Sequence, residues 1–472
     1  MNLKKWLIGI GMSGLVAFGN GCGGGSSVTG PLQPQQQTGS AFVIGTDAPL
    51  PSVVSFQVDI TGISVSDGVD APVPILANMA SVDFARLNGL KALLDINTIP
   101  AGTYTTAVVT LANPQMGYLS VTNPQTNPPT PPTVSTLNST TTPPVSLTTS
   151  TVTITLASPL VVNPGDIDGL KFDFDLRHSI QVDPNGQITG VVNPNLSLEV
   201  VTPSDADAYI DEFDAGVVSV DAGGNSFVVQ GPHGHQFTVT VNSQTEWENG
   251  ESLANLTTNS IVEISGTLAQ TSGAILADTV AILSQNSFYA GGLVTYVDPP
   301  TGQASDFDLY VRNTLPSGTG FQSGQISNIT LTGNENFFIY WWHLRFPSFL
   351  FNSSLMVPGQ RVTVGGPFSN GAVTVKRVVL RHEGHTGAWV VGSTDAGAGT
   401  FQFDSNGLAG VLFNGPVVVY CTPFTVFKGG LTGLGGLTGS TAIPLRVVGL
   451  VLKDPISSQP VFVAHSVELL TN

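Results

Sequence analysis

Residues 54–65 read VSFQVDITGISV, and apolar side chains occupy alternate positions from Val54 to Ile60. Successive side chains of a β-strand point to opposite faces, so this alternation predicts a half-buried antiparallel strand. Short runs of Val, Ile, Thr and Phe, broken by Gly, Asn, Asp and Pro, continue from there to the C-terminus. The best helical pattern, over residues 82–94, is interrupted by a glycine and predicts one or two turns. The sequence therefore predicts an all-β fold.

The composition indicates a large folded chain with few charges. The protein has 472 residues, of which 54 are Gly and 32 are Pro, and 41% are apolar. This apolar content is sufficient for packed cores, and the length predicts about three or four domains. Only 15 side chains are basic and 32 are acidic, giving a formal net charge of −17. An acidic chain without a basic stretch argues against nucleic acid as a partner.

Residues 1–22 have the features of a targeting segment. Two lysines precede a short apolar run, and small residues follow it up to Cys22. The run is too short to span a bilayer, and the segment resembles a bacterial lipoprotein signal. The resemblance implies cleavage before Cys22, a lipid such as palmitate on Cys22, and membrane attachment in the bacterial cell envelope, at the outer membrane. The alternative is an ordinary secretory signal with an incidental Cys22. Residues 23–40, which begin with Gly and Ser, are predicted to form a flexible tether.

The N-terminal domain is predicted to cover residues 41–203. It contains GTDAP from Gly45 and IPAGTY from Ile99, and these motifs resemble an uncharacterised domain of bacterial lipoproteins. The resemblance implies a transthyretin-like (prealbumin-like) β-sandwich and no established activity. Residues 123–150 are rich in Pro and Thr and are predicted to be a disordered insertion.

After Pro203 the sequence repeats itself loosely three times, which predicts three tandem domains over 204–286, 287–384 and 385–472. In the first repeat, strands are predicted near residues 216–220, 225–231, 236–242, 260–269 and 274–283. Five strands with the longest connection between the third and the fourth indicate a small OB-like β-barrel. The units also resemble a second family of uncharacterised repeats from secreted bacterial proteins.

The acidic stretch before the first repeat allows two interpretations. A solvated acidic linker is favoured. The alternative is a calcium site, because closely spaced carboxylates can supply the oxygen ligands that Ca²⁺ requires. Its ligands would be Asp205, Asp207, Asp211, Glu212 and Asp214.

An aromatic stretch in the second repeat provides the candidate binding surface. Strand geometry would place Tyr340, Trp342 and Phe346 on one face and Trp341 on the other. A small barrel buries only one face, so the other must meet a neighbouring domain, a partner or a ligand. Packing between domains is favoured, and recognition of a glycan or a protein through Tyr340, Trp341, Trp342 and Phe346 is the alternative.

Other reactive side chains give weaker signals. The common hydrolase, phosphate-binding and zinc motifs do not occur in the sequence. HEGH at His382 and HGH at His233 are expected at turns with solvated histidines, rather than in a metal site. Cys421 lies in an apolar run and is expected to be an inert buried thiol.

These observations favour a lipid-anchored envelope protein that is not an enzyme, requires no cofactor and serves as a binding or scaffolding module for a glycan or an envelope protein. One alternative is an enzyme acting on envelope polysaccharide, with Asp173 and Asp175 as acid and base. A second alternative is a purely structural spacer.

Overall fold

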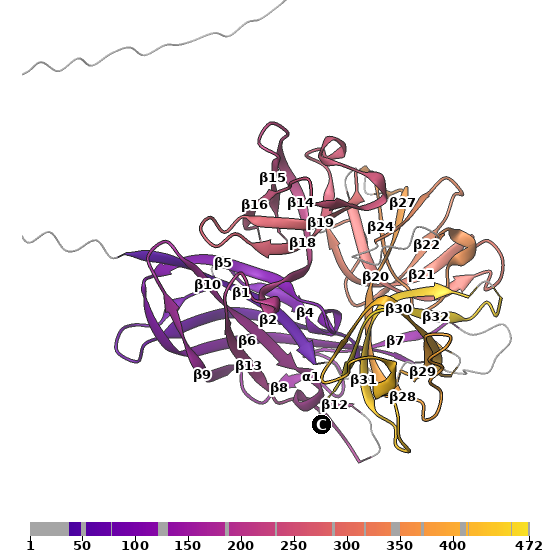
Figure 1. The fold of residues 1–472 in the computed structure, drawn as a ribbon, viewed down its shortest axis with the longest axis horizontal. Helices are drawn as coiled ribbons and strands as arrows, with labels where there is room; N and C mark the ends of the chain where they lie inside the picture. The colour runs from indigo at the N-terminus through magenta and orange to yellow at the C-terminus, as the bar shows by residue number, and fades with distance from the viewer. Residues whose placement is uncertain are drawn as a thin grey trace, which may run out of the picture. The chain divides into compact units, whose positions relative to one another are not determined.

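The computed structural model describes residues 37–470 except 49–52, 77, 121–130, 185–187, 232–233, 286–287, 316–317, 341–349, 370–371, 406–411, 414 and 455. Nearly all regular structure in these residues is β-strand, so the all-β prediction is confirmed (Figure 1). The described helical segments are single turns: α1 (Leu176–Ser179), η1 (Phe84–Leu87), η2 (Ala206–Ala208), η3 (Glu248–Gly250), η4 (Leu253–Asn255), η5 (Ser353–Leu355) and η6 (Leu434–Gly436). The η1 turn lies where the sequence predicted one or two helical turns. No helix among the described residues is long and apolar enough to cross a membrane.

The N-terminal part, residues 37–203, contains two main sheets. The first has the order β13-β10-β1-β5, and the second has the order β3-β2-β6-β7, with β4 also paired to β2 and β9 to β6. The strands of the first sheet are β1 (Thr38–Ala48), β5 (Ala92–Pro100), β10 (Ile167–Asp175) and β13 (Leu196–Val201). Those of the second are β2 (Val53–Ser66), β3 (Val73–Pro74), β4 (Ala80–Asp83), β6 (Gly102–Ser120), β7 (Thr133–Leu137) and β9 (Thr151–Val162). A small third sheet contains β8 (Ser146–Leu147), β11 (Ile180–Val182) and β12 (Ile188–Val192).

The two main sheets share one apolar core. The ring of Phe56 on β2 lies 5.2 Å from that of Phe174 on β10, measured between centroids, and Phe84 on η1 lies 5.1 Å from Phe174. The alternating pattern of residues 54–65 supplies this core, because Phe56, Val58 and Ile60 are all fully buried. The transthyretin-like assignment remains a prediction.

The prediction that residues 123–150 form a disordered insertion is wrong for residues 131–150. Strand β7 pairs with β6, with Leu137 opposite Met116, and β8 pairs with β12. Leu137 and Val145 are buried in the N-terminal core, so a few apolar side chains were enough to order this Pro- and Thr-rich segment. Residues 123–130 lie outside the described residues.

The first and third repeats each close a ring of five strands. In the first repeat the ring runs β14-β15-β16-β19-β18 and closes through the parallel pair β16 and β19. The third repeat is a closed barrel of the same order, β28-β29-β30-β32-β31, with β30 and β32 parallel. In the second repeat, the sheet runs β22-β21-β20-β24-β27-β23. The OB-like assignment remains a prediction, although the predicted number of strands per ring agrees with these pairings.

The strands of the first repeat are β14 (Ile210–Asp221), β15 (Ser226–Gln230), β16 (Gln236–Thr240), β17 (Glu246–Trp247), β18 (Ile261–Leu268) and β19 (Ile275–Ser284). Those of the second are β20 (Phe288–Asp298), β21 (Asp306–Leu315), β22 (Ile326–Thr330), β23 (Asn336–Ile339), β24 (Arg361–Gly366), β25 (Phe368–Ser369), β26 (Ala372–Val373) and β27 (Arg377–Arg381). The third contains β28 (Glu383–Trp389), β29 (Thr400–Asp404), β30 (Val417–Lys428), β31 (Pro444–Lys453) and β32 (Pro460–Leu469).

Apolar cores cross the predicted domain boundaries. Phe42 on β1 belongs to the same buried cluster as Phe213 and Ile264 of the first repeat. Val54 on β2 belongs to a cluster with Phe462 of the third repeat. Residues 37–472 accordingly form one compact unit, and the four parts meet around a common junction.

Candidate functional site

Arginine side chains mark the junction between the four parts. The sequence contains eight arginines, and within the described residues six of them form ion pairs with carboxylates: Arg86, Arg312, Arg361, Arg377, Arg381 and Arg446. Arg86, Arg361, Arg377 and Arg381 reach across a predicted domain boundary to do so, and Arg312 reaches Glu383 at the start of β28, a strand of the third barrel. The junction therefore uses much of the positive charge of a sparsely charged chain.

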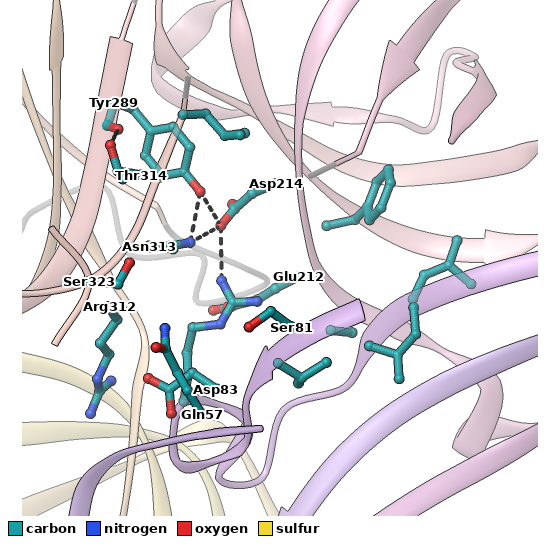
Figure 2. A pocket seen from close by; sticks show the side chains of 17 residues that line it. Gln57, Ser81, Asp83, Glu212, Asp214, Tyr289, Arg312, Asn313, Thr314 and Ser323 are labelled. Carbon is teal, nitrogen blue, oxygen red and sulfur yellow. Dashed lines mark hydrogen bonds and ion pairs between the residues drawn. The ribbon is translucent and has the colours of Figure 1, made fainter. Parts of the chain in front are cut away.

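A cavity of about 320 Å³ lies at this junction (Figure 2). Its lining comes from β2, β4, η1 and β5 of the N-terminal part, β14 of the first repeat, and β20 and β21 of the second. On one side of the cavity, three lining side chains contact the carboxylate of Asp214. Its Oδ2 accepts hydrogen bonds from the Tyr289 hydroxyl at 2.9 Å and from Asn313 Nδ2 at 2.8 Å, and it pairs with Arg86 Nη1 at 3.1 Å. Three of the four parts thus meet at one carboxylate.

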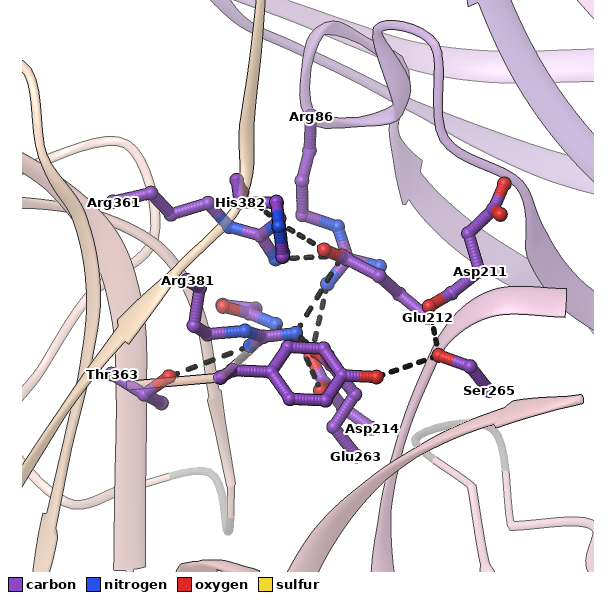
Figure 3. Close-up of polar contacts among 12 residues, drawn as sticks. Arg86, Asp211, Glu212, Asp214, Glu263, Ser265, Arg361, Thr363, Arg381 and His382 are labelled. Atoms are coloured by element: carbon purple, nitrogen blue, oxygen red, sulfur yellow. Dashed lines mark hydrogen bonds and ion pairs between the residues drawn. The ribbon is translucent and has the colours of Figure 1, made fainter. Parts of the chain in front are cut away.

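Two further arginines, on strands of the second repeat, contact Glu212 and Asp214 (Figure 3). Arg361 on β24 pairs with Glu212 through both terminal guanidinium nitrogens, Nη1 and Nη2. Nη2 lies 2.6 Å from Oε2, and the Arg361 side chain is 2% exposed. Arg381 on β27 is fully buried and contacts Asp214 at 3.2 Å, Glu212 at 3.6 Å and Glu263. The carboxylates come from β14 and β18, so these pairs join the first repeat to the second.

Arg312 joins the second repeat to the other two parts. Its Nη1 lies 2.9 Å from both carboxylate oxygens of Glu383 on β28, and its Nε donates to the backbone oxygen of Val54 at 3.2 Å. Removing one partner of such a buried, charge-assisted contact is costly, because the other charge is then left without a partner.

Burial and the arginines act in opposite directions on the carboxylates. Burial disfavours ionisation of Glu212 and Asp214, but Arg361 and Arg381 outweigh it and hold the pKa of both carboxyls below the usual range. Asp83 differs, because burial raises its pKa despite the influence of Arg312. Its Oδ1 accepts the Phe56 backbone N–H at 2.9 Å. The arginines therefore lower the pKa of Glu212 and Asp214, whereas burial raises the pKa of Asp83.

The structure gives the proposed calcium ligands other partners. Asp205 Oδ2 accepts the Thr202 backbone N–H at 2.7 Å, and Asp207 pairs with Lys91 and Lys171. Glu212 and Asp214 pair with arginine, and Asp211 is buried beside them. In the described part of the chain, no group of three or more His, Cys, Asp or Glu residues could hold a metal ion. The interpretation as a solvated linker also needs correction, because Asp211, Glu212 and Asp214 are buried.

The described part of the aromatic stretch packs between repeats. Tyr340 is 1% exposed, and its hydroxyl lies 2.7 Å from Ser265 Oγ and 3.3 Å from Thr279 Oγ1 of the first repeat. For Tyr340 this agrees with the favoured interpretation, packing between domains, and it removes Tyr340 from any exposed stacking surface. Trp341, Trp342 and Phe346 lie outside the described residues, as does Cys22.

The two histidine motifs, HEGH and HGH, were also considered as metal sites. The expectation of a solvated turn is wrong for HEGH, because His382, Glu383 and His385 are buried where β28 begins. Burial lowers the pKa of His385 to about 4, and His235 Nδ1 lies 3.1 Å from Asp95. His233 lies outside the described residues.

The structure also describes Cys421 and the two aspartates considered as acid and base, Asp173 and Asp175. Burial raises the pKa of the Cys421 thiol to about 12, which agrees with an inert thiol. Asp175 caps α1, with Oδ2 at 2.5 Å from His178 Nδ1, and burial raises the pKa of Asp173.

Sequence reasoning missed the arginines of the junction. A signal for them exists in retrospect: Arg361, Arg377 and Arg381 stand within or beside valine-rich strands, where a solvated cation is not expected. A charged residue in such a position indicates a buried ion pair, but its partner is not encoded nearby.

Asp211 provides a test of the junction by pH. Burial raises its pKa to about 7, and Lys91 and Lys428 only partly offset the effect. Because this pKa lies above the ordinary value of 3.8, ionisation of Asp211 destabilises the folded protein as pH rises from about 4 to about 7. Asp211→Asn should therefore stabilise the protein by on the order of 4 kcal/mol above pH 7 and have little effect below pH 4. Melting temperatures of both proteins across this range measure the difference, and a gap that does not change with pH would contradict the assignment.

The fold and this site define an all-β chain whose sheets meet at a buried polar junction. A family model described as a domain of unknown function (DUF4382) matches residues 38–189, and one described as a domain of unknown function (DUF5666) matches residues 215–281. No curated protein matches the chain. The predicted resemblance of the N-terminal domain and the first repeat to uncharacterised domains agrees with these matches.

Proposed function

We propose that this protein is a lipid-anchored binding or scaffolding module of the bacterial cell envelope and is not an enzyme. Cys22 would carry the lipid, residues 23–40 would form the tether, and the outer membrane would hold the anchor. The bound partner would be a glycan or an envelope protein.

The observation that carries this proposal is the junction, where ion pairs fasten four sheet-forming parts into one unit around a lined cavity. Arg312 alone contacts two other parts, through Glu383 and the Val54 backbone. A body held in this way presents a fixed arrangement of surfaces, which favours recognition because little conformational freedom is lost on binding. The tether would let the body reach partners away from the membrane surface.

Lipidation and binding can be tested on the same full chain. Expressed in a bacterium with lipoprotein processing, the chain should incorporate a labelled palmitate analogue and fractionate with the outer membrane. Cys22→Ser should abolish the label, whereas the matched control Cys421→Ser should keep it. The detergent-purified chain should also bind isolated cell envelope.

Equal labelling of the two cysteine variants would refute the anchor. Absence of binding to the envelope would leave the structural spacer as the better interpretation. Turnover of an envelope polysaccharide, lost in Asp173→Asn, would overturn the non-enzymatic assignment.

A further inference from the structure

The ion pairs around the junction cavity balance in charge. Four arginines, at positions 86, 312, 361 and 381, contact four carboxylates, at positions 212, 214, 263 and 383. The remaining carboxyl of the cavity lining, Asp83, is buried, and burial raises its pKa. The paired groups therefore leave no excess charge with which to hold an ion.

Several polar groups that line the cavity have no protein partner. Among the described residues, the side chains of Gln57, Ser81 and Ser323 make no hydrogen bond to another side chain or to the backbone. Figure 2 shows all three among the lining side chains. Arg86 makes one charged contact, through Nη1 to Asp214, and its side chain is 18% exposed. An amide, two hydroxyls and a guanidinium offer both donors and acceptors to an occupant.

Apolar side chains form the rest of the lining. Phe213, Leu93 and Val82 are buried residues that contribute to it. A volume of about 320 Å³ lies at the lower end of the range for small-molecule sites, roughly 300–1,000 Å³. The space therefore suits one small ring with polar edges and apolar faces.

We propose that the junction cavity binds one neutral saccharide ring, with the sugar hydroxyls bonded to Gln57, Ser81, Ser323 and Arg86. A hydroxyl both donates and accepts, so a sugar satisfies this mixed set without adding charge to a balanced network. This inference rests on the proposed function as a binding module and names the chemical class of one ligand and its site.

The test uses the full chain in a detergent without a sugar headgroup. Calorimetric titration with glucose, galactose, mannose and N-acetylglucosamine should show binding of at least one, and more weakly of glucuronate and glucosamine. Gln57→Ala and Ser323→Ala should each weaken binding roughly 2- to 10-fold, as the loss of one hydrogen bond predicts. The matched control Ser226→Ala removes a half-buried serine hydroxyl on β15, away from the cavity, and should leave both affinity and melting temperature unchanged.

Three outcomes would overturn the proposal: no binding at millimolar sugar, tighter binding of a charged sugar, or binding that both cavity variants leave intact. Binding of the same preparation to isolated envelope distinguishes failure of the saccharide site from failure of the proposed function. Envelope binding without sugar binding refutes only the saccharide site, whereas loss of both refutes the proposed function as well.

Discussion

Replacing Glu212 with alanine should destabilise the folded protein by roughly 3–5 kcal/mol, the cost of leaving a buried charge without its partner. Glu212 holds both nitrogens of Arg361, and Arg361 and Arg381 have almost no contact with water. The loss would be read as a fall in melting temperature and in the denaturant midpoint.

Two controls separate the buried charge from the general cost of substitution. Glu199→Ala removes a partner of Lys171 at 2.5 Å, but the Glu199 side chain is 58% exposed, so less than about 1 kcal/mol is expected. The double variant Glu212→Leu/Arg361→Met removes both charges and should recover much of the stability lost in Glu212→Ala. Equal and small effects of Glu212→Ala and Glu199→Ala would show that the network does not hold the junction together.

Gly384→Ala should destabilise the contact between the third repeat and the N-terminal part by roughly 3 kcal/mol, at the upper end of overpacking costs. A Cβ at this position would lie 2.0 Å from the backbone oxygen of Asn88, which cannot rotate away as a side chain would. The same change would disturb the hydrogen bond from Asn88 Nδ2 to the Gly384 oxygen, 2.9 Å long and buried. Thermal unfolding and limited proteolysis of the full chain measure this effect.

Gly216→Ala is the matched control, because Gly216 also lies in a strand and a Cβ there meets nothing within 4 Å. It should change stability by less than about 0.5 kcal/mol. If Gly384→Ala is as harmless as Gly216→Ala, the close approach of β28 to Asn88 does not exist in solution.

The strands of the first repeat show how far sequence reasoning reaches. The five predicted segments correspond to β14, β15, β16, β18 and β19, and β15 and β16 agree to within two residues at each end. Glycine, asparagine and aspartate mark the turns between them, so the boundaries depend on residues close in sequence. The start of β14 was missed, because Ile210 to Asp214 look like an acidic linker rather than a strand. The carboxylates of Glu212 and Asp214 are buried beside arginines from other parts of the chain, which balance their charge.

The sequence by itself determined the all-β class, most strand positions and the single helical turn after β4, because alternation and turn chemistry act between near neighbours. Tertiary structure alone decided the site. Arg361 meets Glu212 across 149 residues and Arg381 meets Asp214 across 167, and no local pattern encodes such pairs. Five scattered arginines and the carboxylates that they pair with became one junction because folding removed them from water together, and buried charges are stable only when paired.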